Sequence, residues 1–546
     1  MRLTSTATAA PATVSSARVP GTWRLPARYA MLVAIVGGLA LAAAFPPAGV
    51  WPLAVAGPAL LTVAVWQQRA RVTVAAGAAF GAALFFPLLS WVVNVAWYAW
   101  VGLVIGETLI FAILTLGLWL LLRLPAWPLA VAGWWVLAEA VRDRWPWGGF
   151  PWGRLVMSQA NAPTVRWVAV AGPPFLSFLI ALAGAGIAWV VVGSAHSRRR
   201  GHSGFGARLW PAVAATAAIG VAVCGALLPA DPAGPRQQTA EVAAIQGDVP
   251  HATNLPDLVR ATQVTQNHAL ATLDLASRVR AGRAQAPDLV IWPENSTDQD
   301  PAFNPGIYAT IASAVARIGA PVLVGALLQD PVRNAGQLWL PGRGPVAVYI
   351  KRRLVPFGEV IPFRGLLNKI TSLPSTIQPV NFTPGHRAVV FHIGKIRLGD
   401  VICYEVAFDG LVSSEVTAGA NLLTVQTNDA AFELDGQTGE TLQQLAMARI
   451  RAIEHDRAVV VASTTGVSAI IAPDGRLLRR TRIWTRAEIE ARVPLRTVTT
   501  LADRLGGWPE GLLAWGTLAA TGWAAVSELA RRRRQRRGEP AIPAAQ

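Results

Sequence analysis

About eight apolar segments, each near the length needed to cross a bilayer, constrain this chain more than any other feature. A membrane-spanning helix needs about 20 consecutive apolar residues. The chain is 53% hydrophobic and 14% charged, whereas soluble proteins average about 25% charged residues. We therefore predict a multi-span α-helical membrane domain. The predicted spans are 29–45, 50–66, 73–93, 97–122, 125–142, 173–193, 209–229 and 509–530.

Basic residues in the short connecting loops predict the orientation of these spans. The formal net charge is +17, and much of it flanks apolar segments, which favours contacts with anionic lipid over nucleic-acid binding. Lys and Arg are enriched in cytoplasmic loops. The basic residues concerned are Arg69, Arg71, Arg123, Arg198–Arg200 and Arg531–Arg534. All of them fall on the cytoplasmic side if both termini are cytoplasmic, which places 230–508 outside.

Five regions follow from these patterns. Residues 1–28 are rich in Ala, Thr, Ser and Pro and predict a disordered cytoplasmic tail. Transmembrane helices 1–7 are expected over 29–229, a large extracytoplasmic domain over 230–508, and transmembrane helix 8 over 509–530. A basic cytoplasmic tail is expected over 531–546.

The 230–508 block differs in character from the rest. Short β-rich runs such as DLVIWPE, IRLGDVICYE and NLLTVQTND alternate with helical patterns at 255–283, 307–318 and 438–455. Strands that alternate with helices are typical of an α/β domain.

Two charged features fall inside the predicted spans. Glu107 lies in the middle of the fourth span, where we expect a neutral, hydrogen-bonded packing role. Glu139 and Arg142 lie three residues apart near the end of the fifth span, a spacing that predicts an ion pair on one helix surface. A role in holding the GFPWG loop or a lipid headgroup stays open as the alternative.

Three reactive side chains in the α/β block each follow a strand-like run. They are Glu294, Lys351 and Cys403. Taken singly, a Glu or Lys is usually a surface group and a Cys after an apolar strand is usually buried packing. Together they supply a base for the thiol proton, a nucleophile, and a cation for the developing oxyanion. Glu359, eight residues after Lys351, either orients that lysine or forms an ordinary surface ion pair.

The cysteine content favours a free thiol at this site. The chain has two cysteines, Cys224 and Cys403. Cys224 lies in an apolar segment, so a disulfide between the two is not expected. A free thiol in an exported domain requires an explanation, and nucleophilic catalysis is one.

The motifs around these residues resemble the nitrilase superfamily and, more narrowly, the apolipoprotein N-acyltransferase family. The similarity covers roughly 29–530. The motifs that carry it are WPE at Glu294, K-x-x-LVPFGE at Lys351, CYE at Cys403, GFPWG at Gly149–Gly153, QGDVP at Gln246–Pro250 and MARIRAIEHDRA at Met447–Ala458. The chain departs from the family pattern at three places. NDAAFE stands where members usually read NDAWFG, Gln444 stands where a His is frequent, and HATNLPDL, after QGDVP, lacks the Trp that members tend to carry there.

The resemblance implies a fold and a role for each matching residue. It implies an α-β-β-α sandwich for the extracytoplasmic domain. Glu294 becomes the general base, Lys351 the oxyanion-stabilising residue and Cys403 the acylated nucleophile, with Glu359 as an additional carboxylate beside the lysine. Tyr404 and Glu405 match residues that flank the nucleophile, and the backbone N–H of Tyr404 becomes a second oxyanion donor.

The resemblance also implies a reaction and its partners. A phospholipid acyl donor forms a thioester at Cys403, and the α-amino group of a diacylated apolipoprotein accepts the acyl chain. No cofactor and no metal site are expected. The bacterial cell membrane is the implied location, with the bilayer itself as a partner. Two alternatives stay open: a membrane-tethered amidase, and a weakly active scaffold for a partner glycosyltransferase.

Overall fold

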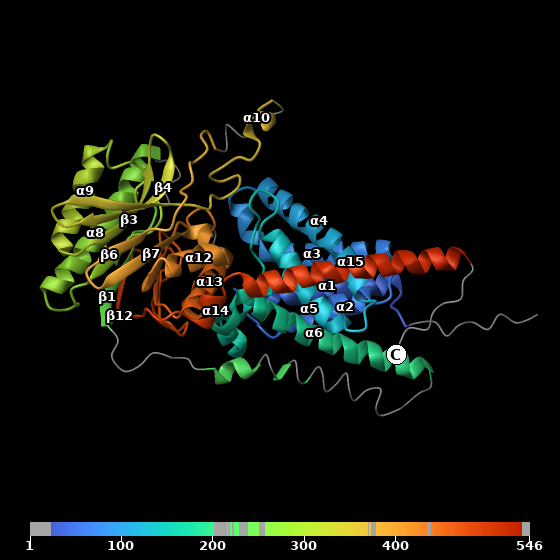
Figure 1. Cartoon of the computed structure of the whole chain (residues 1–546). Helices are drawn as coiled ribbons and strands as arrows, with labels where there is room; N and C mark the ends of the chain where they lie inside the picture. The colour runs from blue at the N-terminus through green and yellow to red at the C-terminus, as the bar shows by residue number, and fades with distance from the viewer. Residues whose placement is uncertain are drawn as a thin grey trace, which may run out of the picture.

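The computed structural model describes residues 23–200, 216, 219–220, 223–228, 238–250, 257–369, 371–372, 378–433 and 438–537. A bundle of helices and an α/β domain lie end to end along the long axis of the molecule (Figure 1). Most of the predicted span 209–229, and most of both predicted tails, fall outside the described residues.

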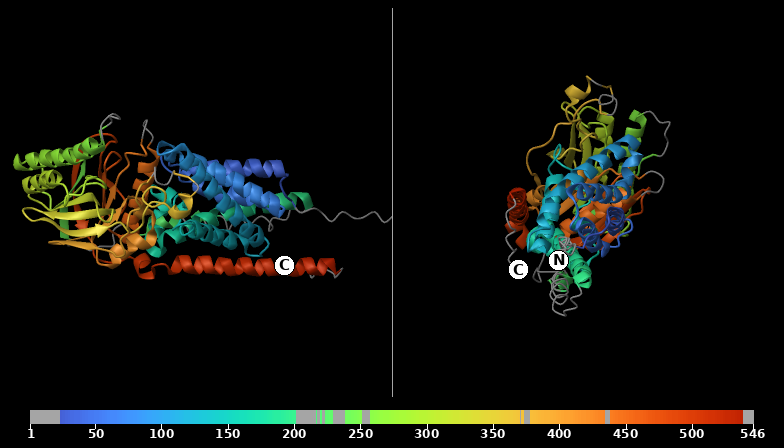
Figure 2. Two further views of the ribbon diagram at one scale, coloured as in Figure 1. Left: turned by 90° about the horizontal axis from the view of Figure 1, so that it is seen from above. Right: turned by 90° about the vertical axis from the view of Figure 1, so that its right-hand side faces the viewer.

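The helical bundle is built from elements at both ends of the chain. Its helices are α1 (Ala27–Ala44), α2 (Leu53–Val65), α3 (Ala70–Leu88), α4 (Trp97–Leu121), α5 (Trp127–Arg142), α6 (Val168–Arg200) and α15 (Trp508–Arg536). The last helix runs alongside the helices of the N-terminal half (Figure 2). It continues through the arginine run, so residues 531–536, predicted as part of a tail, are helical.

Four described helices are long and apolar enough to cross a membrane: α1, α3, α4 and α6 with the turn before it. They correspond to the predicted spans 29–45, 73–93, 97–122 and 173–193. Helix α2 is apolar but has 13 residues. The remaining predicted spans stay predictions.

Arg142 has a different partner from the one expected. Its Nε lies 2.5 Å from Oε2 of Glu107, on helix α4, and its Nη2 donates to the carbonyl of Trp152. Glu139 instead accepts the backbone N–H of Leu155. The predicted Glu139–Arg142 surface pair is therefore wrong, because spacing along one helix gives no information about a partner on the next. Glu107 was expected to be a neutral, hydrogen-bonded packing residue, and the structure instead pairs it with a buried arginine.

The α/β domain contains two six-stranded sheets. The first has the order β12-β1-β2-β3-β4-β5 and the second β11-β10-β9-β8-β7-β6. Strands of the first sheet are β1 (Gln238–Gln246), β2 (Leu289–Ile291), β3 (Val322–Leu328), β4 (Arg333–Leu340), β5 (Gly344–Ile350) and β12 (Ala487–Leu495). Strands of the second are β6 (Val390–Ile393), β7 (Ile396–Ile402), β8 (Leu422–Thr427), β9 (Val459–Ser463), β10 (Ala469–Ile471) and β11 (Leu477–Arg480).

The two sheets face one another between two helical layers. Along β1, Val242 and Ala244 point toward the second sheet, whereas Ala243 and Ile245 belong to a separate core under helices α8 (Asp257–Arg280) and α9 (Pro305–Ile318). This alternation follows from the two-residue period of a strand. Helices α12 (Asp409–Thr417) and α13 (Gly439–His455) cover the outer face of the second sheet. The predicted α-β-β-α sandwich is confirmed.

Helix α13 also belongs to the core of the helical bundle. Its buried residues Leu445 and Met447 form one continuous apolar cluster with residues of the bundle such as Trp91 and Trp152. The α12–α13 layer therefore lies between the second sheet and the bundle, which brings the catalytic sequence motifs close to the apolar helices.

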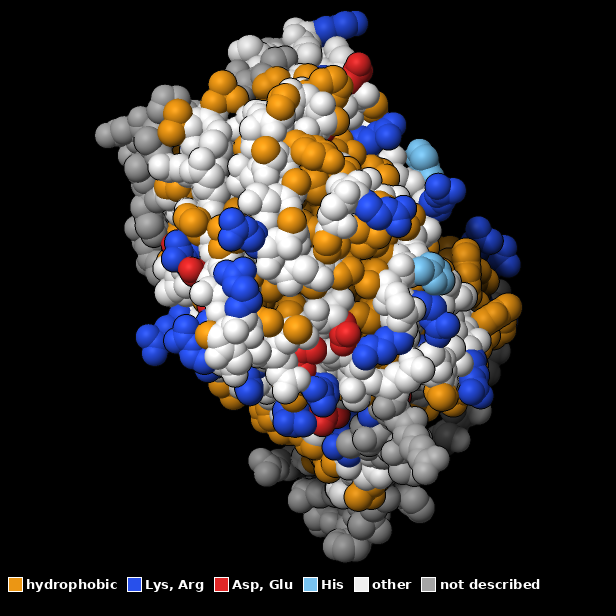
Figure 3. Space-filling view, turned by 90° about the vertical axis from the view of Figure 1, so that its left-hand side faces the viewer, with side chains coloured by type: hydrophobic (Ala, Val, Ile, Leu, Met, Phe, Trp, Pro, Cys, Tyr) orange, Lys and Arg blue, Asp and Glu red, His pale blue; other side chains and the backbone are white. Residues whose placement is uncertain are grey.

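The end of the α/β domain that faces away from the bundle carries a mixture of side-chain types. On the end face formed by the α/β domain, basic side chains are spread among apolar and uncharged ones (Figure 3).

Candidate active site

Cys403 lies where strand β7 ends. It begins the short 3-10 helix η5 (Cys403–Ala407) and has φ of 52°, a left-handed value that is uncommon for a residue other than Gly. Strained backbone of this kind is often found at functional positions. Cys403 is 9% exposed, so the thiol is nearly enclosed.

Lys351 directly follows strand β5 and lies between two carboxylates. Its Nζ is 2.9 Å from Oε1 of Glu294 and 2.9 Å from Oε1 of Glu359. Glu294 follows β2, so two strand ends of the first sheet meet here, as α/β geometry predicts. Since Lys351 is 1% exposed and Glu294 5% exposed, the surface-pair alternative for Glu359 is wrong.

Asn334, on strand β4, was not expected from the sequence. Its Nδ2 donates to Oε1 of Glu294 at 2.6 Å and to Oε1 of Glu359 at 2.9 Å. It therefore bridges the same two oxygens that bind Lys351. No sequence signal pointed to it, because the two glutamates lie 40 and 25 residues away.

Glu405 fixes the nucleophile segment to the lysine segment. Its Oε1 accepts the backbone N–H groups of Arg352 and Arg353 at 2.6 and 2.9 Å. Its Oε2 accepts the backbone N–H of Ile402 and the hydroxyl of Tyr349 at 2.9 and 2.8 Å. One buried carboxylate thus joins the residues beside Lys351 to the residue before Cys403, across the two sheets.

The protonation states follow from burial and from the neighbouring charges. Burial raises the pKa of Glu294, which Lys351 partly opposes. Burial alone would lower the pKa of Lys351, but Glu294 and Glu359 outweigh it and hold that pKa well above its ordinary value. Burial and the Glu294 carboxylate raise the pKa of the Cys403 thiol well above its ordinary value, against the opposing effect of Lys351. The site therefore holds a thiol, an ammonium and a carboxylate of increased basicity.

Helix α13 also contacts the nucleophile. Gln444 on α13 donates from Nε2 to Cys403 Sγ at 3.7 Å and to Oε1 of Glu440 at 3.3 Å. Burial raises the pKa of Glu440 well above its ordinary value, and the carboxylate of Asp429 raises it further. The sequence had marked Gln444 as a departure from the family pattern but gave no indication that it contacts the thiol.

Tyr404 connects the nucleophile to the helical bundle. Its hydroxyl donates to the carbonyl of Gly149 at 2.8 Å, and its ring stacks with those of Phe150 and Trp152. These three residues belong to the GFPWG motif. Tyr404 was predicted from its position beside the nucleophile, and the structure adds its contact with this loop.

Gln443 forms several polar contacts between the two halves of the molecule. Its Oε1 accepts from the indole nitrogens of Trp91 and Trp152 at 3.3 and 2.6 Å. Its Nε2 donates to the carbonyls of Pro46 and Leu88 at 3.0 and 3.1 Å. All four bonds link α13 to the bundle.

The NDAAFE loop also contacts the bundle. Its Phe432 ring lies 5.2 Å from the ring of Trp91, and Nδ2 of Asn94 donates to the Phe432 carbonyl at 2.7 Å. The phenylalanine of this motif is therefore part of the junction, next to Gln443.

Comparison with known proteins relates both halves of the chain to one family. Residues 37–186 match the model of the apolipoprotein N-acyltransferase N-terminal domain, and residues 241–503 match the carbon-nitrogen hydrolase model. The apolipoprotein N-acyltransferase of Mycolicibacterium smegmatis is 37% identical over 499 residues, covering 87% of this chain and 81% of that protein. The one from Azotobacter vinelandii is 29% identical, covering 93% and 96%.

An amidase from Nesterenkonia sp. superposes with a TM-score of 0.36 and 16% identity, covering 48% of this chain and 93% of that one.

Proposed function

Since the chain belongs to the apolipoprotein N-acyltransferase family, we propose that it transfers an acyl chain from a phospholipid to a lipoprotein. The acceptor is the α-amino group of the N-terminal diacylglyceryl-cysteine. The observation that carries the proposal is the enclosed Cys403 thiol beside Lys351, which lies 2.9 Å from both Glu294 and Glu359. That site lies in a domain joined to apolar helices.

In the first half-reaction, Glu294 takes the proton of the Cys403 thiol and the sulfur attacks the ester carbonyl carbon of the donor. The Lys351 ammonium stabilises the oxyanion that forms. When the tetrahedral adduct collapses, the carbon–oxygen ester bond breaks and Glu294 returns its proton to the departing alkoxide. The products are a thioester at Cys403 and a lysophospholipid.

In the second half-reaction, the lipoprotein amine attacks the thioester carbonyl carbon. Glu294 accepts a proton from the attacking nitrogen, and Lys351 again stabilises the oxyanion. The carbon–sulfur bond breaks, the sulfur of Cys403 takes the proton back, and the acceptor leaves as an amide. Two moderate barriers replace one high barrier, which is the general advantage of a covalent intermediate.

The protonation states support these roles. A base is most effective when its pKa is brought toward the working pH, and burial raises the pKa of Glu294 in that direction. The raised pKa of Lys351 keeps it a cation throughout the cycle. Because burial raises the pKa of Cys403, the thiolate forms only as its proton is transferred, so the nucleophile is protected from premature reaction.

The membrane arrangement belongs to the same proposal. The chain spans the bacterial cell membrane about eight times, with 230–508 outside and both termini in the cytoplasm. The basic ends of two distant segments meet, which supports this orientation: Arg123 after α4 and Arg532 at the end of α15 both contact Glu528. This basic end of α15 points away from the α/β domain (Figure 2). A site next to the outer membrane surface would reach two lipid-anchored substrates.

Intact-mass analysis of the purified protein tests the proposal. Incubation with a diacyl phospholipid should add one acyl mass to the wild-type chain and none to Cys403→Ala. A diacylated lipopeptide should then remove the acyl group and become triacylated. Absence of acyl-enzyme from every donor would contradict the proposal, and an acyl-enzyme that only hydrolyses would favour the amidase alternative.

A further inference from the structure

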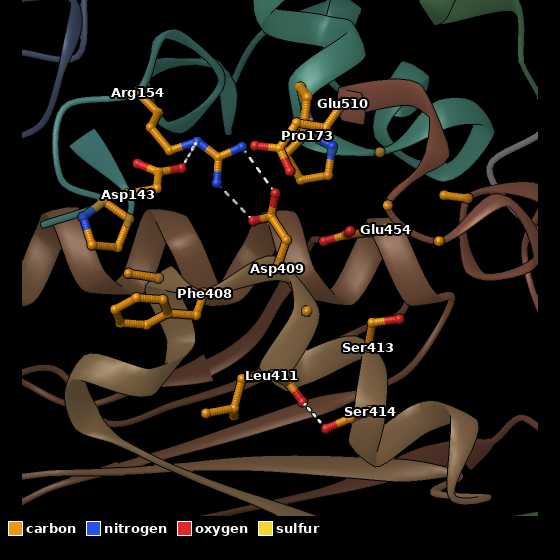
Figure 4. A pocket seen from close by; sticks show the side chains of 18 of the residues that line it. Asp143, Arg154, Pro173, Phe408, Asp409, Leu411, Ser413, Ser414, Glu454 and Glu510 are labelled. Carbon is orange, nitrogen blue, oxygen red and sulfur yellow. Dashed lines mark hydrogen bonds and ion pairs between the residues drawn. The ribbon is translucent and has the colours of Figure 1, made fainter. Parts of the chain in front are cut away.

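A cavity of about 420 Å³ lies between the helical bundle and the α/β domain, separate from the enclosed thiol. Its walls come from the loop after α5, the kinked start of α6, the start of α12 and the loop before α15 (Figure 4). The volume lies within the range typical of small-ligand sites. Pro173, Phe408 and Leu411 supply apolar surface in the lining.

The carboxylates in this wall already have basic side chains as partners. Asp409 accepts two hydrogen bonds from Arg154, which is 2% exposed. The other carboxylates of the wall also lie against basic side chains: Asp143 against Arg154, Glu510 against Arg144, Glu454 against Arg451 and Asp503 against His455. Paired carboxylates contribute little net negative potential, so the character of the cavity depends on the charge that has no such partner.

Arg353 is the lining residue whose charge has no such partner among the described residues. Among the described residues, no carboxylate lies within ion-pair distance of its guanidinium, which stands 5.2 Å from the centre of the Phe408 ring. The residue is exposed and lines the cavity. A guanidinium without a carboxylate partner favours an anion, and its planar donors match the oxygens of a phosphate.

We propose that this cavity binds the phosphodiester headgroup of a phospholipid through Arg353. The inference rests on the proposed function and identifies where the donor headgroup is held. Apolar surface beside a single unpaired cation suits an amphipathic phosphodiester better than a free inorganic ion, and the junction with the apolar helices is where a lipid would enter.

Arg353 is also tied structurally to the nucleophile. Its backbone N–H donates to Oε1 of Glu405, the carboxylate that also accepts from Ile402, the residue before Cys403. The ring of Phe408 also lies 5.0 Å from the ring of Tyr404, the residue that directly follows Cys403. A headgroup bound at Arg353 would therefore be positioned relative to the thiol through two short chains of contact.

A binding experiment tests this site without relying on turnover. Cys403→Ala protein is titrated with an ether-linked phosphatidyl lipid, which cannot transfer an acyl chain, and with the matching ether glycerolipid that lacks phosphate. Arg353→Gln should weaken binding of the phosphatidyl lipid roughly tenfold and leave the phosphate-free lipid unaffected, because a charge-assisted hydrogen bond is lost. Arg343→Gln, at an exposed turn between β4 and β5, makes the same change of charge and should bind as the parent does.

Equal binding of the phosphatidyl lipid by the parent and by Arg353→Gln would overturn the proposal. So would displacement by millimolar inorganic phosphate that depends on Arg353, since the site would then serve a free anion. The reaction gives a second readout: the ratio of acylation rates with phospholipid and with a p-nitrophenyl acyl ester should fall roughly tenfold in Arg353→Gln. If wild type forms no acyl-enzyme but binding still depends on Arg353, the proposed function fails while the headgroup site stands.

Discussion

Gln443 and Gln444 are neighbours in the chain, yet their side chains bind opposite halves of the molecule. Gln443 accepts from the indole of Trp152 in the bundle at 2.6 Å, while Gln444 donates to Cys403 Sγ at 3.7 Å. Successive residues of an α-helix project about 100° apart, so one turn of α13 can face both the bundle and the nucleophile. The position of the thiol relative to the apolar helices is therefore set by this helix.

Replacing Gln443 with Leu should destabilise the protein. The two indole N–H groups and two carbonyls that it binds would lose their partners, and unsatisfied buried groups cost about 1–3 kcal/mol each. We expect a lower thermal unfolding temperature in detergent. The matched control is Gln535→Leu, on the exposed end of α15, which should unfold as wild type does. An unchanged unfolding temperature for Gln443→Leu would show that these bonds do not hold the two halves together.

Replacing Gln444 with Leu should make the thiol harder to ionise. Burial already raises the pKa of Cys403, and loss of an N–H donor to sulfur removes a group that favours the thiolate. The pH midpoint of Cys403 alkylation should therefore move up by roughly one pH unit, equivalent to about 1.4 kcal/mol. A Cys224→Ser background is needed because Cys224 is exposed. Gln444→His retains a donor, so its pH midpoint of alkylation should stay near that of the parent. An unchanged midpoint in Gln444→Leu would show that Gln444 does not favour the thiolate.

Replacing Lys351 with Met should suppress acyl-enzyme formation by roughly 100-fold to 1,000-fold, the usual effect of removing an oxyanion-stabilising group. Loss of the ammonium also leaves Glu294 and Glu359 facing each other without a cation, which should raise the pKa of Glu294 further. Single-turnover acylation followed by intact mass measures the effect. Lys395→Met is the control, since Lys395 is 42% exposed and pairs with Asp288 on the surface. An equal loss of acyl-enzyme formation in Lys351→Met and Lys395→Met would contradict a specific role of Lys351.

Replacing Asp409 with Asn should destabilise the protein in a pH-dependent way. Burial opposes ionisation of Asp409, but Arg154 and Arg451 outweigh it and lower its pKa. A lowered folded-state pKa contributes stability that is present above the unfolded value of about 3.9 and is lost as pH falls through the folded value. We expect a loss of about 3–5 kcal/mol at neutral pH.

The difference in unfolding free energy between Asp409→Asn and wild type should become smaller below a pH of about 4. Thermal unfolding between pH 3 and 7 measures it. Asp474→Asn, at an exposed turn, serves as the control. A destabilisation that is constant over this range would mean that the charge of Asp409 is not its cause.

Much of the site was predictable because its residues lie at the ends of strands. Glu294, Lys351 and Cys403 each follow a β run in the sequence. Strands that run in the same direction bring the first two to one edge of the first sheet, and Cys403 follows β7 of the second sheet, which faces it. The length and apolarity of segments such as 97–122 predicted helix α4 nearly to the residue. Local pattern is sufficient for features of this kind because each depends on neighbours in the chain.

Other features were fixed only by the tertiary structure. Arg142 pairs with Glu107, 35 residues away, rather than with the glutamate three residues before it. Asn334 bridges two glutamates. Gln443 and Gln444 lie in one turn of α13 and contact the bundle and the thiol, respectively. Single polar residues carry no periodic signal in the sequence, and their partners are selected by burial, because a buried polar group must find whichever partner the packed elements bring within reach.

The sequence by itself therefore determined that this chain combines apolar spans with an α/β domain, and which three residues could form a thiol-based acyl-transfer site. The tertiary structure decided how the two parts meet. It positioned α13 and Tyr404 between the nucleophile and the bundle, and left Arg353 facing a cavity at the junction. The reason is physical: spans and strands are encoded by repeating patterns, whereas the junction depends on side chains that become neighbours only when both halves are folded.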